Sequence, residues 1–222
     1  MSAPMTRSRR ADQAAATREA LLDAAERLFA EHGVHGVGIR QISQAADQGN
    51  NTAVSYHFGS KTGLIRAIIR RHADAIERLR GAMIAELGDD DDLRAWLACA
   101  VAPVTAYLDT LGQPSWYARF IAHITADPEL RAIADEQFSA AAGRSSNPLQ
   151  EGLYRCVPGL PDDIRAERSA MTGHLINQTV AARERELADG APTVRQTWAD
   201  CATGLIDALV GLWRAPVTTT MP

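Results

Sequence analysis

Short polar side chains and hydrogen-bonding rings stand close together between residues 50 and 61. An Asn amide can make two hydrogen bonds with adenine, and Thr or Ser hydroxyls can bond to several base edges. Tyr, His, Lys and Arg side chains can reach phosphate oxygens. The candidates are Asn50, Asn51, Thr52, Ser55, Tyr56, His57 and Lys61, with Arg40 upstream. Their chemistry indicates contact with nucleic acid, and a solvated helix face is the alternative interpretation.

Helices and tight turns are expected to position these side chains. Apolar residues recur at intervals of three, four and seven, which is the spacing of an amphipathic helix. Gly33 suits a left-handed helix end, Gly49 a positive φ in a turn, and Ser60 the cap of a following helix. The predicted helices are Thr17–His32, 37–46, 51–58 and Lys61–Leu87. A short helix pair after a supporting helix is the layout of a helix-turn-helix, whose second helix enters the major groove of DNA.

Three motifs in this region resemble a known family. They are Leu22-Asp-Ala-Ala-Glu-Arg-Leu-Phe29-Ala-Glu-His-Gly33, Ile39-Arg40-Gln41-Ile42 and Tyr56-His57-Phe58-Gly59-Ser60-Lys61. In this order they are similar to the DNA-binding domain of the TetR family of bacterial transcriptional regulators, across residues 17–65. The resemblance implies an all-α homodimer whose larger C-terminal domain binds a small molecule and releases DNA. The turn is one residue longer than the family's, and Ser55 stands where an aromatic residue is common.

The remaining sequence also has helical spacing, and no segment alternates for long enough to predict a sheet. We expect an all-α fold with an N-terminal helix-turn-helix domain and a C-terminal helical domain for ligand binding and dimerisation. The expected domains are 1–60, with 1–15 as a flexible arm, and 61–222, with 216–222 frayed. Pro103 should kink or divide the helix predicted over Asp92–Leu111. Asp127-Pro128 and Asn147-Pro148 are expected to begin two further helices, because Asp and Asn are good N-caps and Pro suits the first helical position. Two long helices, Pro161–Leu187 and Thr193–Trp213, are expected to close the chain.

The last predicted helix carries two apolar stripes. One stripe is enough to pack a surface helix, so two imply burial on both sides. A second subunit is the natural cover for one stripe, and a central position in a monomeric bundle is the alternative. The residues assigned to a dimer interface are Trp198, Cys201, Leu205, Leu209 and Leu212.

Aromatic and polar residues on several later helices could line a small-molecule site. A cavity with aromatic walls and a few polar groups is what such a site needs. The candidates are Trp96, Trp116, Tyr117, Phe120, His123, Met171, His174 and Asn177. Core packing is the alternative explanation for the same residues.

The net charge of −4 divides unevenly along the chain. Residues 1–80 hold 12 Lys and Arg against 8 Asp and Glu, whereas residues 81–222 hold 11 against 19. A basic N-terminal part joined to an acidic remainder suggests an anionic partner for one end only. Chance clustering is the alternative.

Several classes of protein find no support in the sequence. No charge-free stretch approaches the ~18 residues of a membrane span, and the polar N-terminus lacks the apolar core of a signal peptide. Cys99, Cys156 and Cys201 are widely spaced, which fits buried thiols in a reducing cytoplasm. Neither His32-x-x-His35 nor the acidic run at 89–92 completes a metal site. The sequence also lacks catalytic motifs and cofactor-binding loops.

These observations predict a cytoplasmic, non-enzymatic transcription regulator without a cofactor. Its expected partners are a double-stranded DNA operator, a second copy of the chain and an unidentified small-molecule effector, with no membrane. The expected mode of action is repression that the effector relieves by shifting the helix that begins at Lys61. The alternative is an all-helical small-molecule-binding protein or enzyme with no role in DNA binding.

Overall fold

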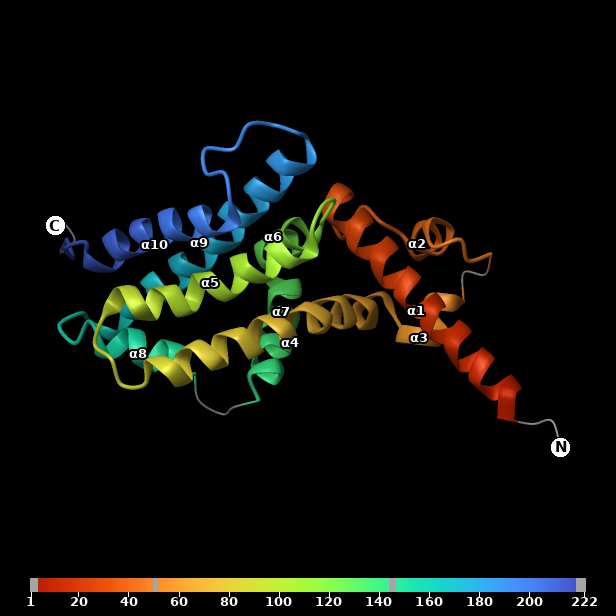
Figure 1. Cartoon of the computed structure of the whole chain (residues 1–222), viewed down its shortest axis with the longest axis horizontal. Coiled ribbons are helices and arrows are strands. Elements are labelled where there is room, and N and C mark those ends of the chain that lie inside the picture. The colour runs from red at the N-terminus through yellow and green to blue at the C-terminus, as the bar shows by residue number, and fades with distance from the viewer. Residues whose placement is uncertain (1–3, 50–51, 144–146, 219–222) are drawn as a thin grey trace.

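The structure, a computed structural model, describes residues 4–49, 52–143 and 147–218, with side chains from Ala11 onward. This part of the chain forms ten α-helices and no strand, so the all-α prediction is confirmed (Figure 1). None of these described helices is long and apolar enough to cross a membrane. The helices are α1 Pro4–His32, α2 Ile39–Ala45, α3 Ala53–Phe58, α4 Lys61–Leu87, α5 Leu93–Leu111, α6 Tyr117–Ala126, α7 Pro128–Ala142, α8 Pro148–Arg155, α9 Asp162–Ala188 and α10 Trp198–Arg214.

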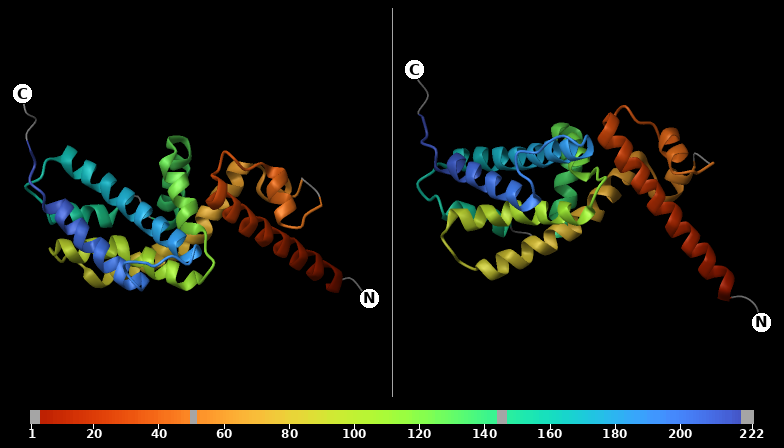
Figure 2. Two further views of the ribbon diagram at one scale, coloured as in Figure 1. Left: turned by 90° about the horizontal axis from the view of Figure 1, so that it is seen from above. Right: turned by 45° about the horizontal axis from the view of Figure 1, so that its top comes forward.

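The molecule is elongated, with α1, α2 and α3 at one end and the C-terminal helices at the other (Figures 1 and 2). One hydrophobic cluster extends from the first three helices into α4 and α6. Within it, Phe29 of α1 lies against Phe120 of α6, with ring centroids 6.1 Å apart. A second cluster joins α5, α8, α9 and α10. The core thus continues past residue 61, and the domain boundary predicted there stays a prediction.

The first helix is longer than the apolar spacing predicts. It begins at Pro4 instead of Thr17 and so includes most of the segment expected to be a flexible arm. Residues 11–16 include three consecutive alanines, and alanine has the highest helix propensity. Proline suits the first helical turn because the N–H that it lacks would be unpaired there. Apolar spacing detects only the buried part of a helix, so it missed this exposed extension.

Helix caps that the sequence predicts are present in the structure. α4 has both predicted ends, and the Ser60 hydroxyl caps it. The carboxylate of Asp127 accepts from two N–H groups of α7, and the Asn147 side chain accepts from one of α8. Proline occupies the first turn of both helices. Caps are predictable because their partners lie two or three residues away.

α5 runs without a break through Pro103, so the helix is not divided there, and the kink that the sequence also allows stays a prediction. Proline has no N–H, and the carbonyl of Cys99, four residues earlier, therefore loses its helical donor. The Arg80 guanidinium of α4 replaces it, donating from Nη1 to the carbonyl oxygens of Cys99 and Ala100, both at 3.0 Å. A side chain from another helix thus satisfies the backbone that the proline leaves unpaired.

The turn between α2 and α3 differs from the prediction in the residue that adopts a positive φ. Asp47 has a φ of 53°, whereas Gly49 lies outside the left-handed region. The N–H of Gln48 donates to the carbonyl oxygen of Ser43 at 2.9 Å, which closes the end of α2. Aspartate is one of the few residues besides glycine that tolerate this backbone region. The chain therefore turns directly at the helix end, two residues before the glycine.

α10 is covered on two sides by its own chain, because it packs against both α5 and α9. Four of the residues assigned to a dimer interface are at most 7% exposed, and the fifth, Leu212, is half-buried. The four are Trp198, Cys201, Leu205 and Leu209. The four buried side chains fill the core of their own subunit, and a dimer interface on this helix stays a prediction. A central position in the bundle accounts for both apolar stripes.

Candidate nucleic-acid interface

The two faces of α3 have opposite surroundings. Val54 is fully buried, and Phe58 is half-buried against the core. Thr52, Ser55 and Tyr56 are exposed, Tyr56 to 80%. Residues three and four apart share a helix face, so these three side chains form one polar row. The structure therefore brings together three of the predicted DNA contacts on a helix whose other side is fixed in the core.

The other predicted DNA contacts have different settings. Arg40 is exposed in the first turn of α2. His57 is half-buried, and its ring lies 4.9 Å from that of Tyr56 in an edge-on arrangement. Asn50 and Asn51 lie outside the described residues. Arg40 and Tyr56 are thus the ones placed on the surface where a phosphate could reach them.

A close backbone approach fixes α3 to α4. Gly59 ends α3 with a φ of 73°, and the Ser60 hydroxyl accepts from the N–H of Gly63 at 3.0 Å. A Cβ at Gly63 would lie 2.0 Å from the carbonyl oxygen of Phe58, so only glycine fits there. The orientation of α3 relative to α4 depends on this short joint.

The ammonium group of Lys61 is bonded inside the protein. Its Nζ donates to the carbonyl oxygens of Val34 at 2.6 Å and Val37 at 2.7 Å, and lies 5.6 Å from the ring centroid of Phe29. Partial burial lowers the pKa of this ammonium. An ammonium has three donors, and two of them hold the loop between α1 and α2. The side chain predicted to contact phosphate therefore positions α2.

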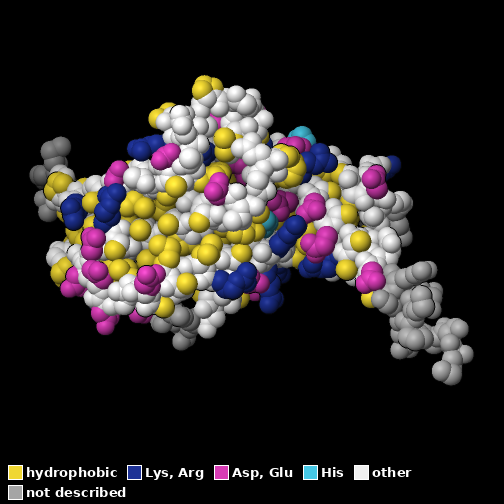
Figure 3. Space-filling model, in the orientation of Figure 1, with side chains coloured by type: hydrophobic (Ala, Val, Ile, Leu, Met, Phe, Trp, Pro, Cys, Tyr) yellow, Lys and Arg dark blue, Asp and Glu magenta, His cyan; other side chains and the backbone are white. Residues whose placement is uncertain are grey.

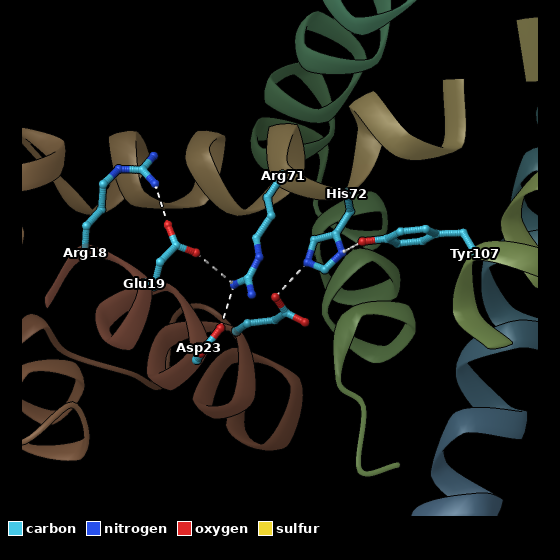
Figure 4. Close-up of polar contacts among 7 residues, drawn as sticks. Arg18, Glu19, Asp23, Arg71, His72 and Tyr107 are labelled. Atoms are coloured by element: carbon cyan, nitrogen blue, oxygen red, sulfur yellow. Dashed lines mark hydrogen bonds and ion pairs between the residues drawn. The ribbon is translucent and has the colours of Figure 1, made fainter. Parts of the chain in front are cut away.

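A chain of buried polar groups joins α1, α4 and α5 beneath this region (Figure 4). His72 bridges Glu26 and Tyr107 with hydrogen bonds of 2.8 Å each, and its ring stacks on Tyr117 with centroids 4.0 Å apart. Burial, and next the charge of Glu26, raises the pKa of Tyr107 and so favours the protonated phenol. Because unpaired buried polar groups are costly, this chain helps to fix the orientation of α1.

The residues predicted to line a small-molecule site lie in different settings. Trp96 belongs to the cluster of α5, α8 and α10, where its Nε1 donates to the carbonyl oxygen of Asp90 at 2.6 Å. Tyr117 and Phe120 belong to the cluster that reaches α1. The others are exposed or half-buried: Trp116, His123, Met171, His174 and Asn177. Core packing thus accounts for the three buried aromatic residues, and the ligand assignment stays a prediction.

Comparison with known proteins agrees with this arrangement of helices. The family model described as bacterial regulatory proteins of the tetR family matches residues 21–68, which include α2 and α3. The chain is 36% identical over 154 residues to the HTH-type transcriptional repressor AcnR of Corynebacterium glutamicum, an alignment that covers 65% of this chain and 72% of AcnR. This chain belongs to the TetR family. It is a DNA-binding transcription regulator.

The TetR fold extends over nearly the whole chain. A protein assigned to this family from Shewanella sp. PV-4 has a TM-score of 0.57 at 15% identity, with 89% of this chain and 95% of that one covered. The TetR-family regulator PfmR from Thermus thermophilus has a TM-score of 0.54 at 15% identity, with 89% and 99% covered. At this level of identity the similarity concerns the fold alone. The similarity includes the C-terminal helices, which the family model does not match.

The sequence interpretation missed polar residues that hold the TetR framework together over long distances. The Glu184 carboxylate of α9 accepts from the N–H groups of Ala118 and Arg119 at the start of α6, and from the Arg119 guanidinium. It is 2% exposed, and these partners lie 65 or 66 residues earlier. The available signal was its spacing, because Glu184 continues the buried stripe of Val180 and Ala181. A charged residue on an apolar stripe indicates a buried partner.

Proposed function

We propose that this regulator is a homodimeric repressor that leaves a near-palindromic operator when a small-molecule effector binds. Each subunit places α3 in a major groove. The observation that carries the proposal is the exposed row of Thr52, Ser55 and Tyr56. Their hydroxyls suit base edges and phosphates. The relative AcnR is named a transcriptional repressor, which supports repression as the mode of action.

In this proposal residues 1–60 bind DNA, and residues 61–222 bind the effector and dimerise. α4 begins at that boundary and carries the joint to α3, so a shift of α4 changes the separation of the two α3 helices. A dimer matched to half-sites one helical turn apart, about 34 Å, tolerates little mismatch. A coupling free energy of ~1–3 kcal/mol between effector and operator is enough for a switch.

The outer faces of α9 and α10 form the subunit interface in this proposal. Met171 and Leu175 of α9 are 42% and 38% exposed, which is high for large apolar side chains. Exposed positions of α10 include Thr203, Ala208 and Gly211, whose small side chains allow a partner helix to approach closely. Hydrophobic side chains gather over the face where α5 and α10 lie (Figure 3). Burial of this surface in a dimer supplies a hydrophobic driving force.

DNA binding is tested on duplexes that the protein selects from a random pool. We expect a recurring near-palindrome, and an affinity that falls steeply between 50 and 200 mM salt because phosphate contacts release counterions. Ser55→Ala should relax the preference at one position in each half-site. Ser139→Ala, the same change at an exposed site on α7, is the control and should leave selection unchanged. Absence of any selected sequence would refute operator reading and favour the all-helical enzyme or carrier.

Dimerisation is tested by light scattering, since one subunit has a mass of 24.0 kDa. We expect twice that mass for the unaltered protein. Leu175→Glu should give monomers, because it places a charge in the proposed interface. Leu79→Glu changes a leucine of similar exposure, 42%, on α4 and should leave the dimer intact. A dimer that survives Leu175→Glu would exclude this face of α9 from the interface.

A further inference from the structure

A cavity of about 530 Å³ lies between α1, α4 and α7. Four of its lining side chains are arginines, Arg18 of α1 and Arg66, Arg70 and Arg71 of α4, and the amide of Gln137 on α7 also lines it. The volume is in the range of small-molecule sites. No residue predicted to bind the effector lines this cavity. The lining of this cavity is therefore cationic and rich in hydrogen-bond donors, whereas the sequence predicted an effector site with aromatic walls.

The cavity carries more positive charge than its own carboxylates balance. Only Glu19 and Asp74 among its lining residues are acidic, against four guanidinium groups. Arg18 pairs with Glu19 at 3.0 Å, and Arg66 pairs with Glu136 at 3.3 Å from outside the lining. In the described part of the chain no ion pair is formed by Arg70. At least one cationic group is thus available to an anion.

The basic surplus noted in residues 1–80 comes from the first part of α4, which also lines the cavity. Residues 1–60 hold six arginines and six carboxylates, so they are neutral overall. Residues 61–80, the first part of α4, hold six cationic and two acidic residues. Three of those six cations line the cavity, and Lys61 bonds to the α1–α2 loop. Basic side chains lie beside acidic ones along the joint between the two ends of the molecule (Figure 3).

Arg71 links the cavity to α1. Its Nη1 lies 2.6 Å from the carboxylate of Asp23 and 4.0 Å from that of Glu19, both on α1 (Figure 4). The next residue, His72, holds Glu26 of the same helix. An anion in the cavity competes with the α1 carboxylates for Arg71, because one guanidinium cannot serve all of them in full. Occupation of the cavity therefore acts on the contact between α1 and α4.

We propose that this cavity is the effector site and that it takes a small polyanion, a molecule with two or more carboxylate or phosphate groups. This inference rests on the proposed function, in which an effector changes operator affinity, and it extends the effector site across residue 60, because α1 contributes Arg18, Glu19 and Leu22 to the lining. Arginine is suited to the site because its planar fork bonds to carboxylate or phosphate through two parallel hydrogen bonds. Arginines from two helices can hold separate anionic groups of one ligand. The Gln137 amide adds a neutral donor from a third helix.

DNA phosphate is the competing occupant for the same arginines. The acidic lining residues Glu19 and Asp74, and the recess between three helices, favour a small molecule over a phosphate backbone, which needs an open basic surface. The two occupants are separable by experiment, because a small anion binds without DNA present.

The test is calorimetric titration of the full-length protein with pyrophosphate and with succinate, at constant ionic strength and without DNA. We expect saturable binding of at least one probe, and the chemistry that binds identifies the anionic group. Arg70→Gln should weaken this binding at least tenfold. Arg78→Gln is the matched control, because Arg78 is an exposed arginine of the same helix that does not line the cavity. Failure of both probes to bind, or an equal loss in both variants, would overturn the site.

A second measurement follows the affinity for a selected duplex. A saturating concentration of the probe should change the affinity for the duplex at least threefold in the unaltered protein and in Arg78→Gln. In Arg70→Gln the probe should leave the affinity for the duplex unchanged. Probe binding without any change in DNA affinity would overturn the role as effector site. If Arg70→Gln weakens DNA binding and no probe binds, the arginines serve DNA phosphate and the inference fails. If no DNA binds at all, the proposed function fails, while the calorimetry still decides whether the cavity takes an anion.

Discussion

The exposed face of α3 and the framework around it use polar side chains for different purposes. Ser55 and Tyr56 point to solvent, and Val54 behind them anchors the helix. Lys61 and Glu184 instead bond to backbone groups of other segments, where they replace water. These bonds fix the α1–α2 loop and the start of α6, which belong to the framework that carries α3. Substitutions in this framework should therefore cost stability, and substitutions on the exposed face of α3 should cost DNA affinity.

The largest effect is expected for Glu184→Ala. It leaves Arg119, 9% exposed, without its carboxylate and removes the acceptor from two N–H groups of α6. Breaking a buried ion pair on one side costs about 3–5 kcal/mol of unfolding free energy. Urea unfolding measures the loss. Glu186→Ala, at an exposed position of the same helix, should stay within ~0.5 kcal/mol of the unaltered protein. Equal losses of unfolding free energy in both variants would show that the bonds of Glu184 to α6 do not stabilise the fold.

The substitution Lys61→Met tests whether Lys61 positions the α1–α2 loop or contacts DNA phosphate. Loss of two charge-assisted hydrogen bonds to the Val34 and Val37 carbonyls should lower the unfolding free energy by about 1.5–3 kcal/mol. DNA affinity should fall as well, because the α1–α2 loop loses its anchor. The slope of log affinity against log salt should stay unchanged, since a phosphate contact contributes about one unit to that slope. A slope reduced by about one at unchanged stability would make Lys61 a phosphate ligand.

The sequence predicted features whose partners are local. Ser60, Asp127 and Asn147 cap helices through bonds that span two or three residues, and each was identified from residue type and position. Partners that only packing brings together were not identified. Arg80 serves the carbonyl of Cys99 from 19 residues away. Nothing in local spacing records such a contact, because it depends on how two helices cross.

The candidate site shows the same division. The row of Ser55 and Tyr56 follows from helical period and polarity, so the sequence could predict it. The arginine cavity could not be predicted, because Arg18 and Arg70 belong to different helices and meet only after folding. The charge surplus of the first 80 residues was visible in the sequence, but nothing there shows that three arginines of α4 line one cavity with Arg18 of α1.

Tyr56→Ala tests the exposed face of α3. The side chain is 80% exposed, so its removal should change the unfolding free energy by no more than ~0.5 kcal/mol. Loss of a phosphate contact and of contact area should weaken binding to a selected duplex about tenfold, which is about 1.4 kcal/mol. Fluorescence anisotropy measures the affinity, and urea unfolding measures the stability. A variant that is destabilised but binds DNA normally would assign Tyr56 to the framework instead.

Ser43→Ala gives the smallest effect and the opposite sign. The Ser43 side chain is fully buried in α2, and among the described residues its hydroxyl has no hydrogen-bond partner. A buried hydroxyl without a partner is unfavourable, and alanine favours helix more than serine does. The variant should therefore unfold with a free energy higher by up to ~1 kcal/mol and bind DNA as before. A loss of stability would show that the hydroxyl has a partner, such as a bound water. Burial alone therefore does not make a polar side chain stabilising: the buried Glu184 carboxylate has donors on α6, whereas the buried Ser43 hydroxyl has no partner among the described residues.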